Sequence, residues 1–341
     1  MNHKTYQTDN PQTDQEIAAL AKKYSTPHTR DYIRQLLTTV IKLHLDGADE
    51  RDLFLLNTTI KELRHIFRTF AKYRAKRKVV IFGSHRTPAD SLEYKMVEDF
   101  AKGIVEQGFM VITGGGGGVM EAGNKGAGKE GFAIKIKLPL EVQPNQYIAQ
   151  GEKLLNVNYF FTRKLAFIKE SEATVLFPGG FGTHDEGFEI LTLMQTGKAA
   201  PRPIVLVETP GKSYWKTWLA FVKKELIKGG YVREIDLNLF RIVNSAQAAV
   251  KAVTEFYKNY HSIRYARDIT IIRLNHKISE QYLQKLSCKY QDVIEGEIKP
   301  SGPLPVEVRN KEFLSLPRLC LKFDRMSYGR LLELVGDLNK A

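Results

Sequence analysis

The first 72 residues carry hydrophobic side chains at helical spacing. After a polar stretch over 1–12, the segments 14–23, 27–45 and 48–72 repeat apolar residues three and four positions apart. This pattern predicts a helical N-terminal region. One apolar stripe within it is predicted to be buried, and it consists of Ile33, Leu36, Leu37, Val40 and Ile41.

From residue 79 onward, short apolar segments alternate with segments of helical period. The expected strands cover 79–82, 109–113, 132–138, 173–177, 203–207 and 240–243. Strands that are apolar on both faces and alternate with helices are typical of a parallel sheet covered on both sides. We therefore predict an α/β fold, a Rossmann-like doubly wound parallel sheet, over residues 75–260.

A second, smaller pattern follows residue 261. It predicts a strand at 269–274, a helix at 279–290, a turn-rich stretch around 299–303, a strand at 318–323 and a helix at 328–338. This order suggests a small α+β appendage of split-βαβ type. The predicted division is a helical region over 1–74, the sheet domain over 75–260 and the appendage over 261–341.

Composition supports a globular protein in a reducing compartment. Of the 341 residues, 43% are hydrophobic and 26% are charged, which excludes a fully disordered or fibrous chain. Cys288 and Cys320 are too few for a disulfide framework and lack metal-ligand spacing. The N-terminus has no apolar core and the chain has no run of 18 uncharged apolar residues, so we expect neither a signal peptide nor a membrane span and predict a cytoplasmic protein.

The net charge of +13 lies mainly in the flanking regions. Residues 1–78 hold 15 Lys and Arg against 9 Asp and Glu, and residues 261–341 hold 14 against 10. The segment 64–78 has seven basic residues and no acid, which fits either a nucleic-acid patch or a helix end. The aromatic residues Phe67, Phe70 and Tyr73 are three apart and continue a helix face, so we favour the helix and do not expect nucleic acid as a partner.

Five consecutive glycines, 114–118, follow an expected strand and precede an expected helix. Glycine allows close approach of a ligand, and a helix N-terminus offers N–H groups to an anion, so the segment predicts a phosphate or nucleotide site. A flexible tight turn is the structural alternative. The glycines fit no G-x-G-x-x-G register, and the segment 123–130 departs from a Walker A loop at Glu130, so we expect no dinucleotide cofactor.

A second loop of this kind follows the strand expected at 173–177. Pro178 ends that strand, and Thr183 is expected to begin a helix. The glycines between them and beside them, at 179, 180 and 182, leave the backbone accessible to a ligand. Loops after parallel strands meet at one sheet edge, where α/β proteins bind ligands. Thr183 and Glu186 also fit a capping box at a helix start. A capping role is therefore the structural alternative to a functional role for Glu186. We expect His184 to be a solvated polar residue rather than a base.

The segment 178–186, Pro-Gly-Gly-Phe-Gly-Thr-His-Asp-Glu, resembles the PGGxGTxxE signature of the LOG family. That family comprises cytokinin riboside 5′-monophosphate phosphoribohydrolases and nucleotide 5′-monophosphate nucleosidases, formerly labelled lysine decarboxylases. Residues 79–84, 114–127 and 158–164 resemble its first strand, its glycine loop and its Arg-Lys segment in the same order. The resemblance covers about 75–260. The sequence departs from the family pattern at His184, at Gly187 and in the aromatic run 159–161.

The resemblance implies a nucleoside 5′-monophosphate as substrate, with free base and ribose 5-phosphate as products. It implies that Arg163 and Glu186 form the catalytic pair and that Lys164 and Thr192 line the site. The 5′-phosphate is expected at Gly180, Gly182 and Thr183, and the remaining substrate-binding positions are expected at Ser84, Gly115, Gly116, Gly179 and Asp185.

We expect no metal or redox cofactor, because the sequence shows neither a metal-ligand cluster nor a dinucleotide fingerprint. In the implied reaction a carboxylate can stabilise an oxocarbenium ion, and an arginine can clamp phosphate or ribose oxygens. The family also implies a homodimer or higher homo-oligomer. The basic flanks leave open an alternative, a non-catalytic nucleotide- or nucleic-acid-binding regulatory protein.

Overall fold

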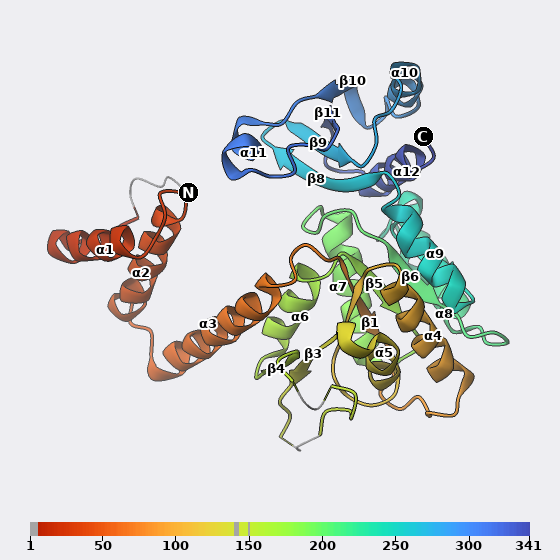
Figure 1. Cartoon of the computed structure of the whole chain (residues 1–341), viewed down its shortest axis with the longest axis horizontal. Coiled ribbons are helices and arrows are strands. Elements are labelled where there is room, and N and C mark those ends of the chain that lie inside the picture. Colours follow the sequence, from red (N-terminus) through yellow and green to blue (C-terminus); the bar gives the residue numbers. More distant parts are fainter. Residues whose placement is uncertain (1–5, 140–142, 149–150) are drawn as a thin grey trace. The chain divides into compact units, whose positions relative to one another are not determined.

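The computed structural model describes residues 6–139, 143–148 and 151–341 of the chain (Figure 1). The chain divides into two compact units, residues 1–64 and residues 65–341. The predicted division at residues 74 and 260 stays a prediction. Among the helices of the described ranges, none is both long and apolar enough to cross a bilayer.

A seven-stranded parallel sheet organises the second unit, which confirms the predicted fold class (Figure 1). The strand order is β4-β3-β2-β1-β5-β6-β7. The strands are β1 (Lys78–Phe82), β2 (Met110–Thr113), β3 (Gly131–Ile136), β4 (Leu154–Val157), β5 (Ala173–Leu176), β6 (Ile204–Val207) and β7 (Arg241–Val243). All six predicted strands are present, and β4 is an edge strand that the pattern did not predict.

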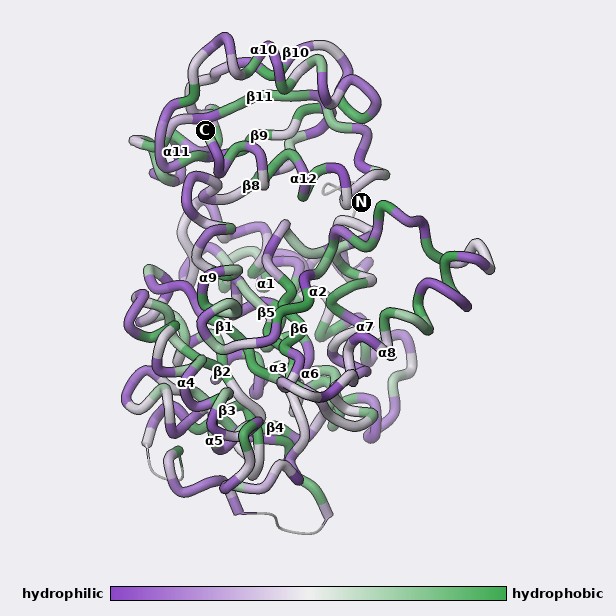
Figure 2. The backbone as a smooth tube through the Cα atoms, turned by 90° about the vertical axis from the view of Figure 1, so that its right-hand side faces the viewer, coloured by the Kyte–Doolittle hydropathy of each residue, from purple (hydrophilic) through white to green (hydrophobic). Residues whose placement is uncertain are grey.

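Helices connect these strands and cover both faces of the sheet. They are α4 (Leu92–Glu106), α5 (Val119–Ala127), α6 (Phe160–Lys169), α7 (Phe181–Gln195), α8 (Tyr214–Phe221) and α9 (Ala246–Phe256), with shorter helical turns η1 (Gly128–Glu130), η2 (Val222–Ile227) and η3 (Glu234–Leu239). Val79 and Ile81 of β1 pack with α4 and α9, whereas Val80 packs with α6 on the opposite face. Figure 2 shows the hydrophobic colouring along these central strands. The strands are apolar on both faces because both faces are covered.

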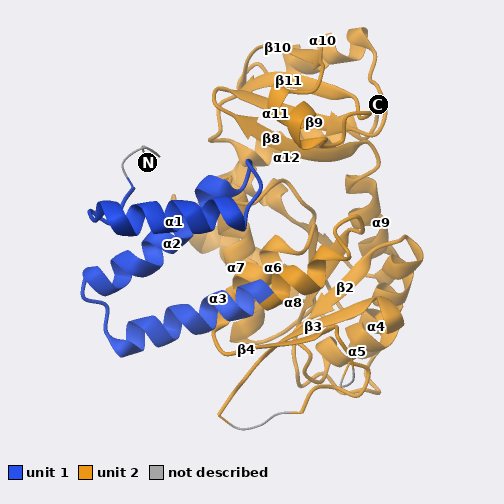
Figure 3. Cartoon of the chain, turned by 60° about the vertical axis from the view of Figure 1, so that its left-hand side comes forward, with its two compact units in different colours: residues 1–64 blue, residues 65–341 orange. Residues whose placement is uncertain are grey.

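The first unit contains α1 (Pro11–Lys23), α2 (Arg30–Leu45) and most of α3 (Glu50–Ala71) (Figure 3). The three predicted helices are confirmed, but the predicted burial of the α2 stripe is wrong. Leu36 is 58% exposed and Val40 is 50% exposed. Thr38 is the buried residue of α2 instead. Helical spacing identifies an apolar face, but burial of that face requires a second surface. Within the described part of this unit, Ile33 and Leu37 are partly buried, whereas Leu36, Val40 and Ile41 are exposed.

The appendage is a second, antiparallel sheet in the order β10-β11-β9-β8. Its elements are β8 (Tyr260–Ala266), β9 (Ile269–Leu274), α10 (Glu280–Lys289), β10 (Ile294–Ser301), α11 (Pro305–Asn310), β11 (Arg318–Phe323) and α12 (Tyr328–Leu338). β9 and β10 are each antiparallel to β11 and enclose it, so β9-α10-β10 is the predicted split βαβ unit. The stretch expected to be turn-rich, 299–303, instead begins as the end of β10, an edge strand that can accommodate Pro300.

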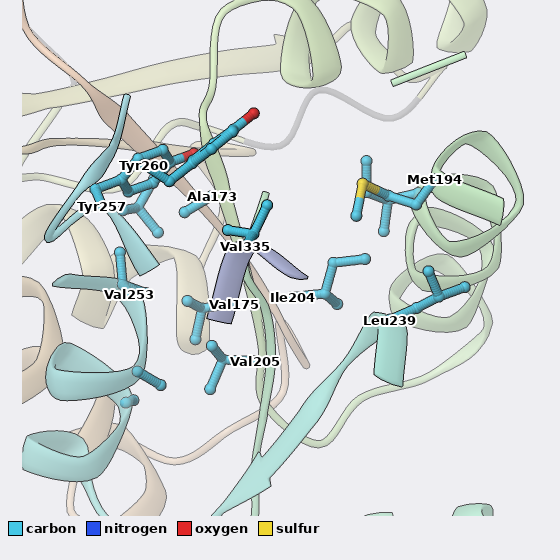
Figure 4. Close-up of a cluster of buried hydrophobic side chains, with 14 of the residues drawn as sticks. Ala173, Val175, Met194, Ile204, Val205, Leu239, Val253, Tyr257, Tyr260 and Val335 are labelled. Carbon is cyan, nitrogen blue, oxygen red and sulfur yellow. The ribbon is translucent and has the colours of Figure 1, made fainter. Parts of the chain in front are cut away.

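The appendage shares a hydrophobic core with the parallel sheet through α12. Val335 and neighbouring apolar residues of α12 are buried in the same cluster as Ile204 of β6 and Val253 of α9. Figure 4 shows Val335 among the side chains of Ala173, Val175 and Ile204. The two sheets of the second unit are therefore joined by buried contacts rather than by a bare linker.

Candidate functional site

Three loops meet at the carboxyl ends of β1, β2 and β5, and Ser84 lies at their junction. The Ser84 N–H donates to the Pro178 carbonyl at 3.0 Å, and the Ser84 carbonyl accepts from the Val119 N–H at 3.0 Å. Ser84 follows β1, Pro178 follows β5, and Val119 begins the helix after the glycine loop. The parallel order therefore brings both glycine loops to one edge of the sheet, as the sequence pattern predicts.

The glycines of these loops serve close packing between the loops rather than flexibility. Gly118 has a φ of 61°, and a Cβ there would lie 2.4 Å from the Ser84 carbonyl oxygen. A Cβ on Gly179 would lie 2.1 Å from Thr183 Oγ1 of its own loop and 3.0 Å from the backbone nitrogen of Ser84 in the loop after β1. Any larger residue at either position would push the loops apart. By contrast, a Cβ on Gly180 or Gly182 would meet nothing within 4 Å, so space is open above the first turn of α7.

A buried amide network holds the glycine loop in place. The Asn145 N–H donates to the Gly115 carbonyl, and Asn145 Nδ2 donates to the Gly116 carbonyl, each at 3.0 Å. Asn145 Nδ2 also donates to Asn124 Oδ1, which accepts from Thr113 Oγ1 at 2.8 Å. Sequence reasoning missed Asn145, because it lies in an irregular loop with no motif of its own.

We expect Asn145→Ala to loosen the glycine loop. The substitution removes three side-chain hydrogen bonds, including the one that Asn145 Oδ1 accepts from the Tyr147 N–H. It also leaves buried Asn124 short of one donor, which costs on the order of 1–3 kcal/mol of folding free energy. Thermal denaturation should show a lowered Tm, and titration with AMP should show weaker binding. Gln146→Ala, a change at the exposed neighbour, is the control. Equal behaviour of the two variants would remove Asn145 from this role.

Glu186 and Lys164 form the centre of a charged cluster between α7 and α6. Glu186 is only 6% exposed, and its Oε2 lies 3.4 Å from Lys164 Nζ. The same Nζ lies 2.9 Å from Asp185 Oδ2 and 3.0 Å from Glu189 Oε2. Burial lowers the pKa of Lys164, but its hydrogen bonds with Asp185 and Glu189 outweigh that effect and leave the pKa raised. One lysine thus faces three carboxylates, and Glu186 is the most buried of the three.

The capping interpretation of Glu186 is wrong. Helix α7 begins at Phe181 rather than at Thr183, with Gly180 as its N-cap residue and no side-chain cap. The N–H groups of Thr183 and His184 both donate to the Gly180 carbonyl, so Thr183 already lies inside the helix. The glycines at 179, 180 and 182 let the chain enter the helix earlier than the cap-type residue suggested. Glu186 therefore lies in the second turn, where its carboxylate faces α6.

Burial raises the pKa of Glu186 to about 7, although Lys164 and Arg163 both act to lower it. A carboxyl group with this pKa exchanges its proton near neutral pH, which suits an acid–base or electrostatic role. Burial lowers the pKa of Arg163, and the negative charge of Glu186 opposes that lowering.

Arg163 presents a guanidinium group with unused hydrogen-bonding capacity. Its Cζ lies 4.9 Å from the ring centroid of Phe160 and 5.6 Å from that of Phe167. Its Nε is buried and has no hydrogen-bond partner among the described residues. A Cβ on Gly114 would lie 3.9 Å from Arg163 Nη1, so the guanidinium lies beside the glycine loop. A buried donor without a partner is costly, and a bound ligand would satisfy it.

The remaining candidates divide into two groups. The site brings together Ser84, Gly115, Gly116, Gly179, Thr183 and Asp185, while Gly180 and Gly182 form the open first turn of α7. Thr192 lies further along α7 and is exposed, and no hydrogen bond joins its side chain to the other candidates within the described ranges.

His184 is not the solvated residue that we expected. His184 Nε2 and Tyr214 Oη are joined by a 2.6 Å hydrogen bond, and Tyr214 Oη donates to the Gly179 carbonyl at 2.5 Å. Burial lowers the pKa of His184. The pair therefore fixes the loop after β5 through the Gly179 carbonyl. Tyr214 is a second residue that sequence reasoning missed.

The basic segment 64–78 uses its aromatic residues for packing. Phe70 is buried, and its ring stacks on that of Phe132 with centroids 4.6 Å apart. Tyr73 meets the same ring edge-on, and Phe67 packs against this core. These three rings face the protein interior, which supports the helix interpretation of the segment.

Comparison with known proteins confirms the resemblance to the LOG family. Residues 116–253 match the family model described as possible lysine decarboxylase. A probable cytokinin riboside 5′-monophosphate phosphoribohydrolase of Oryza sativa subsp. japonica, LOGL5, is 29% identical over 160 residues, which are 46% of this chain and 63% of the relative. The chain thus spans less than two thirds of that relative's length. The Arabidopsis thaliana enzyme LOG3 is 25% identical over 188 residues, 54% of this chain and 85% of the relative.

Among solved structures, the molybdenum cofactor carrier protein of Chlamydomonas reinhardtii matches 53% of this chain and 97% of its own. The two are 21% identical, with a TM-score of 0.39.

Proposed function

We propose that this protein hydrolyses the N-glycosidic bond of a nucleoside 5′-monophosphate and releases free base and ribose 5-phosphate. The observation that carries the proposal is Glu186, a buried carboxyl group with a pKa of about 7 beside Arg163, where the glycine loops meet. The curated relatives are named as phosphoribohydrolases of a nucleoside monophosphate, which supports the same reaction class.

The open first turn of α7 is the proposed phosphate site. Gly180 supplies no side-chain cap, and the Thr183 and His184 N–H groups donate to the Gly180 carbonyl, so the Phe181 and Gly182 N–H groups are the ones available to an anion. Gly180 and Gly182 leave space above them for the phosphate oxygens. From this anchor the ribose would extend toward Arg163 of α6 and Glu186 of α7.

The reaction breaks the bond between ribose C1′ and the base nitrogen and forms a bond from C1′ to a water oxygen. Positive charge develops on the ribose as the base departs, and the ionised Glu186 carboxylate stabilises it. The attacking water gives up a proton, which Glu186 can accept at its raised pKa. The departing base takes up a proton from solvent, and Glu186 returns its proton to solvent, so one water is consumed and no net proton is gained or lost. The planar fork of Arg163 holds phosphate or ribose oxygens and keeps the substrate in register.

The proposed role of Glu186 predicts a pH dependence. The carboxylate must be ionised in the free enzyme, so kcat/KM should fall about tenfold per pH unit below about 7. Lys164 lowers the pKa of Glu186, so Lys164→Gln should move this limb to higher pH. The second ionisation of the substrate phosphate, at about pH 6, adds a further fall in kcat/KM at low pH. No protein variant changes the pH at which that fall occurs. A limb whose position is the same in both proteins would contradict this assignment.

Base release is the direct test of the proposed function. Purified protein is incubated with AMP, GMP, CMP and UMP, and free base and ribose 5-phosphate are measured by chromatography. We expect equimolar products from at least one nucleotide. Binding of a nucleotide without release of base from any of them would refute the enzyme and favour the non-catalytic binding protein.

Assembly into a homodimer or higher homo-oligomer belongs to the same proposal. Phe160 and Phe161 at the start of α6 and Phe181 at the start of α7 are all exposed, and Phe181 is 96% exposed. These apolar side chains border the proposed site, and a second copy of the chain would remove them from water.

A further inference from the structure

A cavity lies at the amino ends of the strands of the parallel sheet, opposite the end that carries the candidate site. It has a volume of about 520 Å³ and is lined by the first residues of β6 and β7, the end of η3, the end of α9 and α12. The candidate site lies at the carboxyl ends of the strands, whereas this cavity lies at their amino ends. Its volume falls within the roughly 300–1,000 Å³ typical of small-molecule sites.

The floor of this cavity is apolar. Ile204 and Leu239 are buried there, and Phe256 and Leu332 are partly buried. Figure 4 shows Ile204 and Leu239 in this region, with Val335 of α12 nearby. Such a floor suits the ring or hydrocarbon body of a ligand.

The cavity also carries an excess of positive charge. Arg241, Lys258 and Lys340 line it and are exposed, and Glu255 is the acidic residue among the described lining residues. Glu255 pairs with Lys251 at 3.7 Å. Lys340 pairs with Asp337, but neither Arg241 nor Lys258 has an ion pair within the described ranges.

Hydrogen bonding to Asp337 raises the pKa of Lys340, and the nearby positive charge of Arg241 offsets only part of this effect. The uncompensated charge of the cavity therefore belongs to Arg241 and Lys258, which have no ion pair within the described ranges. Arg202, also in the cavity wall, is 9% exposed, and its Nε is buried without a partner in the described structure. Its Nη1 donates to the Ile168 carbonyl at 3.0 Å and to Ser171 Oγ at 3.3 Å, and the nearby charge of Glu172 opposes the lowering of its pKa by burial. An anion in the cavity would relieve this concentration of like charge.

Gly336 supplies an independent indication that the cavity is kept open. A glycine inside a helix costs about 1 kcal/mol relative to alanine, so its presence in α12 calls for a reason. Gly329 of the same helix has one, because a Cβ there would lie 2.1 Å from the Ile235 carbonyl oxygen. A Cβ on Gly336 would meet nothing within 4 Å, and Gly336 lines the cavity. Packing within the chain therefore does not explain this glycine. A ligand in the cavity would explain it, because a side chain at position 336 would take up the space of the ligand.

We propose that this cavity binds a small organic phosphate, with its apolar or ring body on the floor and its phosphate at Arg241, Lys258 and Lys340. Several cations around one opening suit a multiply charged phosphate group, and the apolar floor distinguishes an organic phosphate from inorganic phosphate. The proposal is independent of the reaction proposed for the other edge of the sheet.

The test uses the fluorescent probe 8-anilinonaphthalene-1-sulfonate, which combines a ring body with an anionic group. Gly336→Leu fills the cavity from a position that has room for a side chain, and it should raise rather than lower the helix propensity of α12. Arg241→Gln with Lys340→Gln removes two of the cations. Lys277→Gln with Lys285→Gln makes the same change of charge at exposed positions outside the cavity and is the matched control.

We expect Gly336→Leu to abolish one saturable component of probe binding, and the cavity double variant to weaken that component at least tenfold. The control pair should bind as the intact protein does. ADP and ribose 5-phosphate are then tested as competitors for this component, with inorganic phosphate as the reference. Stronger displacement by ADP indicates a nucleotide, and stronger displacement by ribose 5-phosphate indicates a sugar phosphate.

Three results would overturn the proposal. The first is probe binding that is unchanged in both cavity variants. The second is an equal loss of binding in the control pair, which would indicate general charge attraction. The third is displacement by the organic phosphates that is no stronger than displacement by inorganic phosphate.

Discussion

Glu186→Gln is expected to lower kcat for base release by about 10²–10³-fold, the size seen when one electrostatic stabiliser of a transition state is removed. Glutamine retains the shape of the side chain but not the charge that faces the developing oxocarbenium ion. Glu186 lies in the second turn of α7 and does not cap the helix, so the loss would not come from a broken helix start. Initial rates at saturating nucleotide and pH 8 measure the effect.

Glu189→Gln is the matched control for this variant. Glu189 lies one turn further on the same helix, and its carboxylate contacts the same Lys164 Nζ at 3.0 Å, but it is less buried than Glu186. Removing this charge should change kcat only a few-fold. Similar losses in both variants would show that the overall charge of the Lys164 cluster matters and that Glu186 has no special role.

Stability should respond to Glu186→Gln in the opposite direction to activity. The pKa of Glu186 is raised from 4.5 in the unfolded chain to about 7 in the folded one, so the folded state holds the proton more tightly. The contribution of this group to stability therefore falls as pH rises from 4.5 to 7. At pH 8 the variant should have a Tm equal to or above that of the intact protein, which separates loss of catalysis from loss of fold.

The sequence predicted the central sheet because its strands are covered on both faces, and continuous apolar runs result. It missed β4, β8 and β10, which lie at sheet edges. β10 contains Pro300, which cannot donate to a strand ladder and is confined to edge strands. Asn156 of β4 and Gly296 of β10 are residue types that are depleted in strands. A pattern based on buried strands is therefore weakest at the edges of sheets.

The candidate site was predictable as far as its residues lie in glycine loops or in the Arg163-Lys164 segment. Asn145 and Tyr214 were not, because each reaches the site from a distant part of the chain and acts through hydrogen bonds to loop carbonyls. The start of α7 was misplaced for a different reason. Thr183 has the side chain of a capping residue, yet the chain enters the helix two residues earlier, at Phe181.

Arg163→Lys is expected to lower kcat/KM by about 10²-fold, because lysine keeps the charge but loses the planar fork that binds two oxygens at once. Lysine would also lose the contact of the guanidinium with the rings of Phe160 and Phe167. The matched control is Lys164→Arg at the next position of α6, where the present contacts are those of a single Nζ with carboxylates, so its loss should be smaller.

Arg163→Ala provides the sharper version of the same prediction. The substitution leaves a space between the two rings and beside the glycine loop, and methylguanidine has the size and charge to enter it. We expect activity to fall as in Arg163→Lys or further, and to recover in proportion to added methylguanidine but not to added methylamine, because only the guanidinium offers the paired donors. Equal recovery by methylguanidine and methylamine would show that positive charge alone is needed. No recovery with either compound, in a variant whose Tm is unchanged, would exclude the guanidinium as a direct substrate clamp.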